Sequence, residues 1–471
     1  MLTSSTLYAT MGVLSRVASL LVLPLIARHF SVEQYGLFDT YISLIALLTA
    51  LSIFGQDSAV ARNFYDFSDN SLRRGFISTS LCSVILLFSI ISLVLYMGMP
   101  VLTANGYFTG TFEYRYLALL LFTNLLITFG EVILRVSNDL IRYATLCVAN
   151  ASCSVIFTLV GIKWLKADLS TFMQITAIQY ALVATIAVAL TRKWFVIPSE
   201  IVHNRTVMWF TLPIGATVIV GLLQPVLERV LIARGIGTNE LGVYAAALKL
   251  SIAVSLPVAA FQTAITPIVM ETYRQGSFSE NINLMVKTIL CILVCVAIVL
   301  TAFGETITSL VLGVQFRDVP SLLPPLTAGI IFQAMGSMLG VGTILSRKTH
   351  VRLWGNLLFV PVSLLLIGVL GAQFGLVGIA YAYAGGKAGL MIYDGLSAQL
   401  LHPIKWDYRG LLLICGVWLT ASIALPNLRT ASLLKVLSLC FTCLLIFGSF
   451  YGSLTAAQRR DLRALAWRNR S

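Results

Sequence analysis

The chain has 471 residues, of which 58% are hydrophobic and 11% charged, and its formal net charge is +13. Soluble domains carry roughly 25% charged residues, so this composition excludes a water-soluble globular protein. Long apolar runs recur along the whole chain with short polar connections between them. The pattern predicts an all-α polytopic membrane protein.

A helix needs roughly 20 apolar residues to cross the hydrocarbon core of a bilayer. Fourteen runs of the sequence are predicted to meet this requirement. They lie near residues 6–28, 36–58, 76–99, 115–135, 141–162, 171–191, 208–233, 242–268, 284–304, 321–345, 353–372, 375–400, 410–426 and 432–453. Gly371 and Gly375, with Gln373 between them, predict a tight turn between the eleventh and twelfth spans.

The basic residues indicate how these spans are oriented. With the N-terminus placed in the cytoplasm, twenty of the 32 Lys and Arg residues fall on the inner side and eight on the outer side. This asymmetry follows the positive-inside rule and predicts that both termini are cytoplasmic. The net positive charge therefore requires no nucleic-acid partner. It suits an anionic cytoplasmic leaflet.

A short motif repeats at an offset of 206 residues. Leu25–Arg28 reads Leu-Ile-Ala-Arg, as does Leu231–Arg234, and a glycine follows eight residues later in each copy, at Gly36 and Gly242. Six spans separate the copies, so both run in the same direction through the membrane. Parallel repeats of this kind are a transporter architecture. We expect two six-helix lobes, residues 1–200 and 201–403, followed by two extra helices and a basic tail in residues 404–471.

Four basic residues lie deep in predicted spans, where a charge costs at least ~2.5 kcal/mol and faces the protein interior. They are Arg16, Arg229, Lys249 and Lys387. We expect them to bind an anionic substrate in a cavity, since the arginine fork suits phosphate. Interhelical ion pairs and snorkelling are the structural alternatives for these residues. Three further cations at span ends are candidate entrance or gate charges: Arg28, Arg62 and Arg234.

Acidic residues in the spans are candidates for ion coupling or gating. The candidates are Asp57, Glu228 and Asp394. Lys387 and Asp394 lie two turns apart on one helix face, so they form either a coupling pair or a structural contact. Glu228 is adjacent to Arg229, so the two side chains should point in different directions. Asp39 lies near the predicted outer surface, and we expect it to be solvated.

Other classes of protein lack the features they need. The eight cysteines lie inside apolar runs and the four histidines lie in separate connections, so we expect no metal site. The connections are too short for a catalytic domain, and Gly385-Gly386-Lys387 lacks the spacing of a nucleotide-binding loop. We therefore expect no enzymatic activity and no cofactor.

Two segments resemble a known family. LPLIARHFSVEQYGLF, followed by FGQDSAVARNFYD, resembles the start of Wzx-type oligosaccharide-lipid flippases of the MOP superfamily. LPIGATVIVGLLQPVLERVLIARGIGTNELGVYAAALKL is similar to the start of their second half. The resemblance implies the MOP flippase fold and alternating access. It also implies cavity cations on the first, second, seventh and eighth helices. Arg16, Arg229 and Lys249 fit this pattern, whereas the second span has only Arg62 at its inner end.

The resemblance further implies a substrate, an undecaprenyl-pyrophosphate-linked oligosaccharide moved from the cytoplasmic to the periplasmic leaflet. It implies a monomer that contacts membrane lipids and works with a polysaccharide polymerase and chain-length proteins. A lipid II-type flippase and a MATE-like cation-coupled exporter are the alternatives, although the exporter should have an acidic cavity. Polar residues that could select the sugar include Asn124, Asn150, Gln179, Gln224, Gln262 and Gln333.

Overall fold

The computed structural model describes residues 11, 18, 20–65, 69–104, 114–196, 205–258, 278–346, 348, 350–427, 445–448 and 450–452. Within this part every regular element is helical. After an apolar helix at Leu20–His29, the elements are α2 (Val32–Ile53), α3 (Gln56–Asn63), α4 (Asn70–Ala104), α5 (Tyr114–Val136), α6 (Leu140–Leu159) with η1 (Val160–Trp164), α7 (Leu169–Thr191) with η2 (Arg192–Trp194), α8 (Arg205–Gly235), α9 (Thr238–Ser251) with η3 (Ile252–Ser255), α11 (Phe278–Ala302), α12 (Gly304–Val311), η4 (Val314–Phe316), α13 (Val319–Leu339), α14 (Val341–Leu345), α15 (His350–Leu401) and α16 (Tyr408–Asn427).

The chain is a multi-pass membrane protein. Ten helices of the described part are long and apolar enough to cross a membrane. One of them, α15, has 52 residues and changes direction at Gly375, whose φ of 62° and ψ of −144° are not helical. It therefore contains both spans predicted at 353–372 and 375–400. Most of the predicted first and last spans lies outside the described residues, so the count of fourteen stays a prediction.

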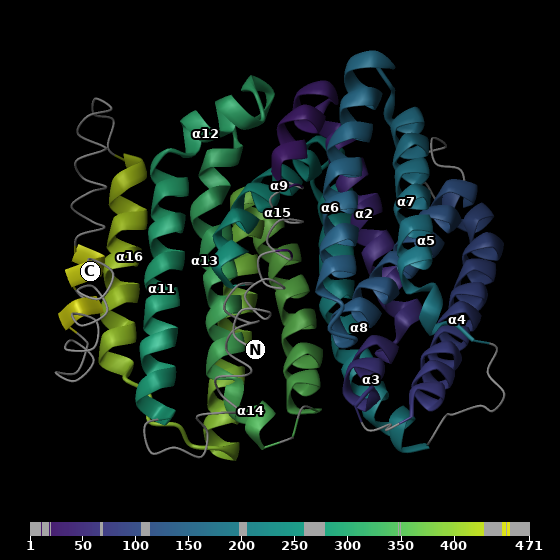
Figure 1. Ribbon diagram of the computed structural model, residues 1–471. Helices are drawn as coiled ribbons and strands as arrows, with labels where there is room; N and C mark the ends of the chain where they lie inside the picture. Colours follow the sequence, from purple (N-terminus) through teal and green to yellow (C-terminus); the bar gives the residue numbers. More distant parts are fainter. Residues whose placement is uncertain are drawn as a thin grey trace, which may run out of the picture.

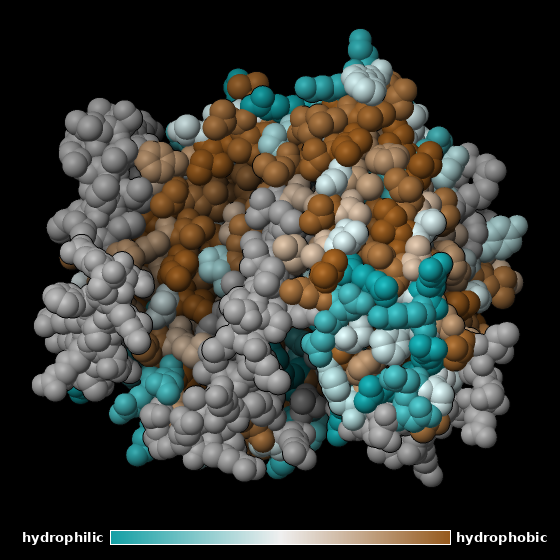
Figure 2. Space-filling model, in the orientation of Figure 1, coloured by the Kyte–Doolittle hydropathy of each residue, from teal (hydrophilic) through white to brown (hydrophobic). Residues whose placement is uncertain are grey.

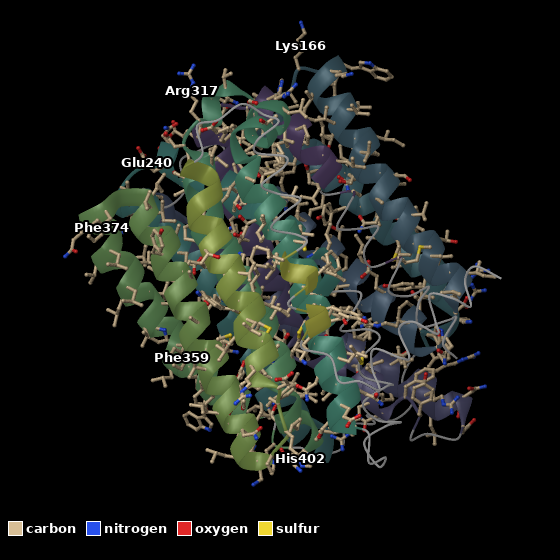
Figure 3. All side chains as sticks on the ribbon, turned by 90° about the vertical axis from the view of Figure 1, so that its left-hand side faces the viewer. Lys166, Glu240, Arg317, Phe359, Phe374 and His402 are labelled. Carbon is tan, nitrogen blue, oxygen red and sulfur yellow. The ribbon has the colours of Figure 1, made fainter. Side chains whose placement is uncertain are left out.

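The connections between spans lie at the ends that the alternation of spans requires. Lys166, Glu240 and Arg317 belong to three connections that were predicted to share the outer side. Figure 3 places these three residues toward the upper part of the molecule and His402, from a predicted inner connection, at the bottom. This arrangement agrees with the predicted alternation of the spans.

The second predicted span, 36–58, is two helices rather than one. A capping box starts α2, because the Ser31 hydroxyl accepts from the Gln34 backbone N–H and the Gln34 side chain accepts from the Ser31 N–H. The helix ends where Phe54 (φ 45°) and Gly55 (φ 77°) both adopt the left-handed conformation. Two such residues in succession cannot continue an α-helix. The chain then restarts as α3, which carries Asp57 and Arg62.

The structure also corrects two other boundaries. The predicted connection between the ninth and tenth spans contains the short helix α12. The tenth span, predicted as continuous over 321–345, is divided at Gly340 into α13 and α14. Both differences are breaks in backbone geometry, to which a count of apolar residues is insensitive.

Helices α4–α7 lie on one side of the molecule and α11, α13 and α16 on the other, with α9 and α15 nearer the middle (Figure 1). Helix α2 packs against both α8 and α9, and α13 packs along α15. The largest hydrophobic cluster runs through residues of both halves of the sequence, including Tyr35 and Tyr244. The division into lobes at residues 200 and 403 stays a prediction. The described helices nevertheless group in space largely by sequence half.

The outer surface of the bundle is apolar. In the most apolar stretch of α4 only 6% of the residues are buried. Leu86, Leu93 and Met97 on this helix are 62%, 59% and 71% exposed. Figure 2 shows extensive hydrophobic surface on the face it presents, with a more hydrophilic area toward the lower right. Large exposed apolar side chains on a spanning helix are explained by contact with lipid.

Candidate functional site

Arg229 of α8 forms an ion pair with Asp39 of α2. Its Nε and Nη2 atoms donate to the same carboxylate oxygen, Asp39 Oδ2, over 2.8 and 2.5 Å. Its Nη1 atom donates to the carbonyl oxygen of Pro225, one turn earlier in α8, over 2.8 Å. The two charged side chains are only 6% and 12% exposed. The expectation that Asp39 is merely solvated was therefore wrong, because α8 lies beside it.

Glu228, the residue before Arg229, faces a different neighbour. Its carboxylate accepts from Gln224 Nε2 over 2.7 Å and from the Tyr244 hydroxyl of α9 over 3.2 Å. Glu228 is 1% exposed and Tyr244 is fully buried. Successive residues of a helix point about 100° apart, so Arg229 reaches α2 while Glu228 lies against α9.

Lys387 of α15 joins the Glu228 group through Gln224. The Lys387 ammonium donates to Gln224 Oε1 over 3.1 Å and lies 5.4 Å from the centre of the Tyr383 ring, within cation–π range. The Gln224 amide therefore bridges a buried carboxylate and a half-buried ammonium, and it also donates to the Ser363 hydroxyl over 3.2 Å. We call Gln224, Glu228, Tyr244, Ser363 and Lys387 the amide-bridged cluster. Its polar groups satisfy one another within a mostly apolar core.

Asp394 is separate from this cluster. It is 5% exposed and lies where α15 packs on α13, so that a Cβ added to Gly336 would approach its Oδ2 atom to 3.4 Å. Lys387 donates to Gln224 and not to Asp394. The direct Lys387–Asp394 coupling pair, one of two readings of the sequence, is not formed in this structure. Asp57 is half-buried in the first turn of α3.

The two remaining predicted cavity cations are Lys249 and Arg16. Lys249 is half-buried on α9, and no described residue accepts a hydrogen bond from its ammonium. Lys249 thus differs from Arg229 and Lys387, whose charged groups already donate to side chains of the described helices. Arg16 lies outside the described residues.

The candidate gate charges lie at the ends of helices. Arg28 donates to the backbone carbonyls of Ser309 and Leu310 on α12. Arg62 and Arg234 are exposed, and each has an interaction partner. Of the three, Arg28 forms the clearest link between sequence halves, because it fixes the end of helix Leu20–His29 to α12.

Three contacts near Arg28 extend this link. Gln315 Nε2 donates to the carbonyls of Ala27 and Phe30 over 2.5 and 3.2 Å. The rings of Tyr35 and Phe316 meet edge to face with centroids 5.8 Å apart. We call these contacts, with those of Arg28, the outer interlock, after the side on which the sequence predicts them. Sequence reasoning missed Gln315 because an exposed glutamine in a connection carries no signal for its partner.

Among the described residues, no group of three or more His, Cys, Asp or Glu side chains could hold a metal ion. None of the described cysteines forms a disulfide. His29 instead donates from Nε2 to the carbonyl of Ala167 over 2.9 Å, which ties the end of helix Leu20–His29 to the connection before α7. The described helices therefore offer buried charge and hydrogen bonding as the chemistry for recognising a substrate.

Comparison with known proteins fits this architecture. Residues 1–273 match the family model described as "Polysaccharide biosynthesis protein". No curated protein sequence matches the chain. Among solved structures, the chain is similar to a lipid II flippase, MurJ, in an inward closed conformation, with a TM-score of 0.73, 17% identity, and coverage of 94% of this chain and 98% of that one.

Two further structures belong to a multidrug resistance MATE family transporter of the MOP superfamily. The inward-facing form gives a TM-score of 0.66 at 16% identity and covers 82% of this chain and 94% of that one. The outward-facing form gives 0.61 at 15% identity, with 84% and 95% coverage. At these identities the similarity shows the fold alone, which is the MOP fold predicted from the sequence.

Proposed function

Since this chain belongs to the polysaccharide biosynthesis protein family, we propose that it is a flippase for lipid-linked oligosaccharides. Its substrate would be an undecaprenyl-pyrophosphate-linked repeat unit, moved by alternating access from the cytoplasmic to the periplasmic leaflet of a bacterial inner membrane. The family match carries this proposal. The MOP fold supplies the transport architecture, and the buried cations supply the charge that a pyrophosphate needs.

In this proposal Arg16, Arg229 and Lys249 neutralise the pyrophosphate while the polyprenyl tail stays in the bilayer. Lys249 is the best-supported of the three, because no described residue competes for its ammonium. Lys387 takes a supporting role, since Gln224 accepts from it. Arg28, Arg62 and Arg234 would act at the ends of the pathway.

The membrane potential could drive the step. Moving two negative charges outward across an inside-negative membrane gains roughly 4.6 kcal/mol per 100 mV. Ion coupling through Asp57, Asp394 or Glu228 is the other source of energy. Asp394 is the candidate we favour among these three, because Glu228 is bonded to Gln224 and Tyr244 and Asp57 is only half-buried. Transport into vesicles with and without an imposed potential separates the two sources.

The remaining features of the proposal follow from the transport cycle. Residues 1–200 and 201–403 would be the two moving lobes, with both termini in the cytoplasm and residues 404–471 adding two helices and a tail. The protein would act as a monomer without enzymatic activity. It would deliver repeat units to a polysaccharide polymerase and chain-length proteins.

A lipid II-type flippase is the second candidate, favoured by the high mutual coverage with the MurJ structure. A MATE-like exporter of cations is disfavoured, because the deep charges of this chain are mainly basic. Lipid II and lipid-linked repeat units share the polyprenyl pyrophosphate and differ in the glycan. Only a functional assay with both lipids separates these two functions.

The test is complementation in two hosts, one lacking its surface-glycan flippase and one depleted of its lipid II flippase. We expect the wild-type protein to restore surface glycan in the first, given a matching glycan, and not to restore growth in the second. Lys249→Met should lose this rescue at normal membrane levels, whereas the charge-conserving Lys249→Arg should retain most of it. Rescue of the second host alone would replace the proposed substrate with lipid II.

A further inference from the structure

The Asp39–Arg229 ion pair joins the two halves of the chain. Asp39 belongs to α2 and Arg229 to α8, 190 residues later. Both side chains are largely shielded, at 12% and 6% exposure. Taking two charges out of water costs several kcal/mol per ion, and their attraction often does no more than offset this cost. The pair therefore calls for an explanation other than stability.

The internal repeat supplies a comparison within the same molecule. At the offset of 206 residues, Asp39 corresponds to Ala245 and Arg229 to Leu23. Ala245 and Leu23 are 1% and 3% exposed and belong to one hydrophobic cluster. The equivalent positions are thus filled by buried apolar side chains. The fold therefore accommodates apolar side chains at these helix positions. The ion pair occurs at only one of the two pairs of positions that the repeat relates.

The geometry leaves the guanidinium held but not saturated. Nε and Nη2 both donate to one oxygen of Asp39, and Nη1 donates to Pro225. A guanidinium has five N–H donors. Three of them have acceptors, and the other two have none among the described residues, which leaves them to donate to an incoming oxygen. A group with several anionic oxygens could bind these two first and then take the place of the carboxylate.

We propose that Asp39 is an internal counter-ion, which holds Arg229 until a diphosphate group displaces it. The inference rests on the proposed function and names Asp39 as a residue that sets its specificity. A monovalent anion would compete poorly with a carboxylate already in place. A diphosphate carries more charge and more acceptor oxygens, and arginine binds it through parallel bonds. Once displaced, Asp39 no longer ties α2 to α8, which couples binding to a change at the junction of the two halves.

The experiment measures diphosphate affinity of the full chain in lipid nanodiscs by calorimetry. One arm uses inorganic pyrophosphate and the other uses undecaprenyl diphosphate. Asp39→Asn should bind the probe about tenfold more tightly or better, the effect of removing one competing interaction of ordinary coupling strength. Its transport rate at saturating substrate should fall, because no counter-ion remains to help release the product. The expected result is thus opposite changes in affinity and turnover.

Two variants control the measurement. Glu33→Gln removes an exposed negative charge from the same helix and should leave diphosphate affinity within about twofold, because exposed charges are screened by salt. In the double variant Asp39→Asn/Arg229→Gln the gain should disappear, since the cation for which Asp39 competes is absent. Unchanged or weaker diphosphate binding by folded Asp39→Asn would overturn the proposal.

A second measurement uses the wild-type protein, in case Asp39→Asn does not fold. Undecaprenyl diphosphate should accelerate hydrogen exchange in the part of α2 that follows Gly36, because the ion pair to α8 has been released. Unchanged exchange at saturating lipid would contradict displacement. A gain in affinity for the inorganic ion alone would overturn the lipid-linked assignment. If Asp39→Asn raises diphosphate affinity but complementation fails, the counter-ion role of Asp39 is supported and the proposed function is rejected. If complementation succeeds but Asp39→Asn does not raise diphosphate affinity, only the counter-ion role is rejected.

Discussion

Gly36 and Gly242, which the internal repeat pairs at an offset of 206 residues, pack directly against each other. A Cβ atom added to Gly36 would lie 2.7 Å from the Gly242 backbone nitrogen, and one added to Gly242 would overlap the Val32 carbonyl oxygen. A residue can touch its own repeat equivalent only near the axis that relates the two copies. The contact between α2 and α9 is therefore consistent with a repeat axis at this crossing and supports the parallel repeat inferred from the sequence.

This crossing predicts a strong difference between two glycines. Gly242→Ala should destabilise the protein by about 3 kcal/mol or more, because the new methyl group meets backbone rather than a movable side chain. Gly221→Ala in α8 is the matched control, since nothing lies within 4 Å of its Cβ position. Thermal unfolding in detergent should show a large loss for the first and little change for the second. Similar stability of the two variants would contradict the close helix crossing.

The hydrophobic pattern was sufficient to predict most of the fold. Each predicted span is mostly helical where the structure describes it, because a bilayer requires long apolar segments. The breaks at Phe54 and Gly340 were not predictable in this way. They depend on backbone conformation, which apolar content does not encode. Gly375 was an exception, because two closely spaced glycines flanked a polar residue.

The sequence was less informative about the candidate site. It singled out Arg229, Glu228 and Lys387 as charges within spans, since ionisable residues in spans are rare and face inward. In the structure Arg229 and Glu228 are buried and Lys387 is half-buried, while their role in transport stays a prediction. The sequence could not assign their partners. Asp39 was judged by its depth alone, whereas its environment depends on the rotation and packing of α2 against α8. Gln224 was one of several polar candidates with nothing to distinguish it until α8 and α15 were placed together.

The amide-bridged cluster predicts a coupling between Glu228 and Lys387. Lys387→Met leaves the Glu228 carboxylate buried without the Lys387 cation, and Glu228→Gln leaves the Lys387 ammonium without the carboxylate. Each variant should therefore lower the free energy of unfolding by about 3 kcal/mol. The double variant should cost less than the sum by about 0.5–3 kcal/mol. Unfolding midpoints of the four proteins in detergent provide the cycle.

Asp394 gives the control for that cycle. It lies seven residues from Lys387, about 10 Å along the helix, and packs toward Gly336. Asp394→Asn combined with Lys387→Met should therefore be additive within about 0.5 kcal/mol. Strong coupling in this pair would revive the alternative in which Lys387 and Asp394 act together.

The outer interlock predicts a shift in conformation. Gln315→Leu removes the donor to Ala27 and Phe30 and should weaken the outer interlock by about 1 kcal/mol, which lowers the population in which it is formed roughly fivefold. In a background without native cysteines, a cysteine at Leu37 should then react faster with a polar thiol reagent. Gln373→Leu changes an exposed glutamine outside the interlock and should leave the rate unaltered. Equal rates in the two variants would show that Gln315 does not stabilise the interlocked conformation.

The attachment of α16 predicts a pH dependence. Asp407, in the turn before α16, pairs with Lys287 of α11, and these side chains are 38% and 3% exposed. Burial raises the pKa of Asp407, but hydrogen bonds from Lys287 and from the Gly410 N–H outweigh it and hold that pKa below its usual range. Because the folded pKa is depressed, the stabilisation is present above the ordinary value of about 3.9 and is lost as the pH falls through the folded value.

Asp407→Asn should therefore lower the free energy of unfolding by about 1–3 kcal/mol at pH 7, toward the lower end because the carboxylate is partly exposed. The difference from wild type should narrow as the pH falls below about 4, because the carboxylate of the unfolded chain begins to take up a proton there while the native carboxylate is still ionised. Asp318→Asn, an exposed carboxylate before α13, serves as the control and should match wild type across this range. Proteolysis rates at the connection between α15 and α16 report the same event locally. A difference that persists unchanged into acid would mean that Asp407 acts through its hydrogen bonds to the turn backbone rather than through its charge on Lys287.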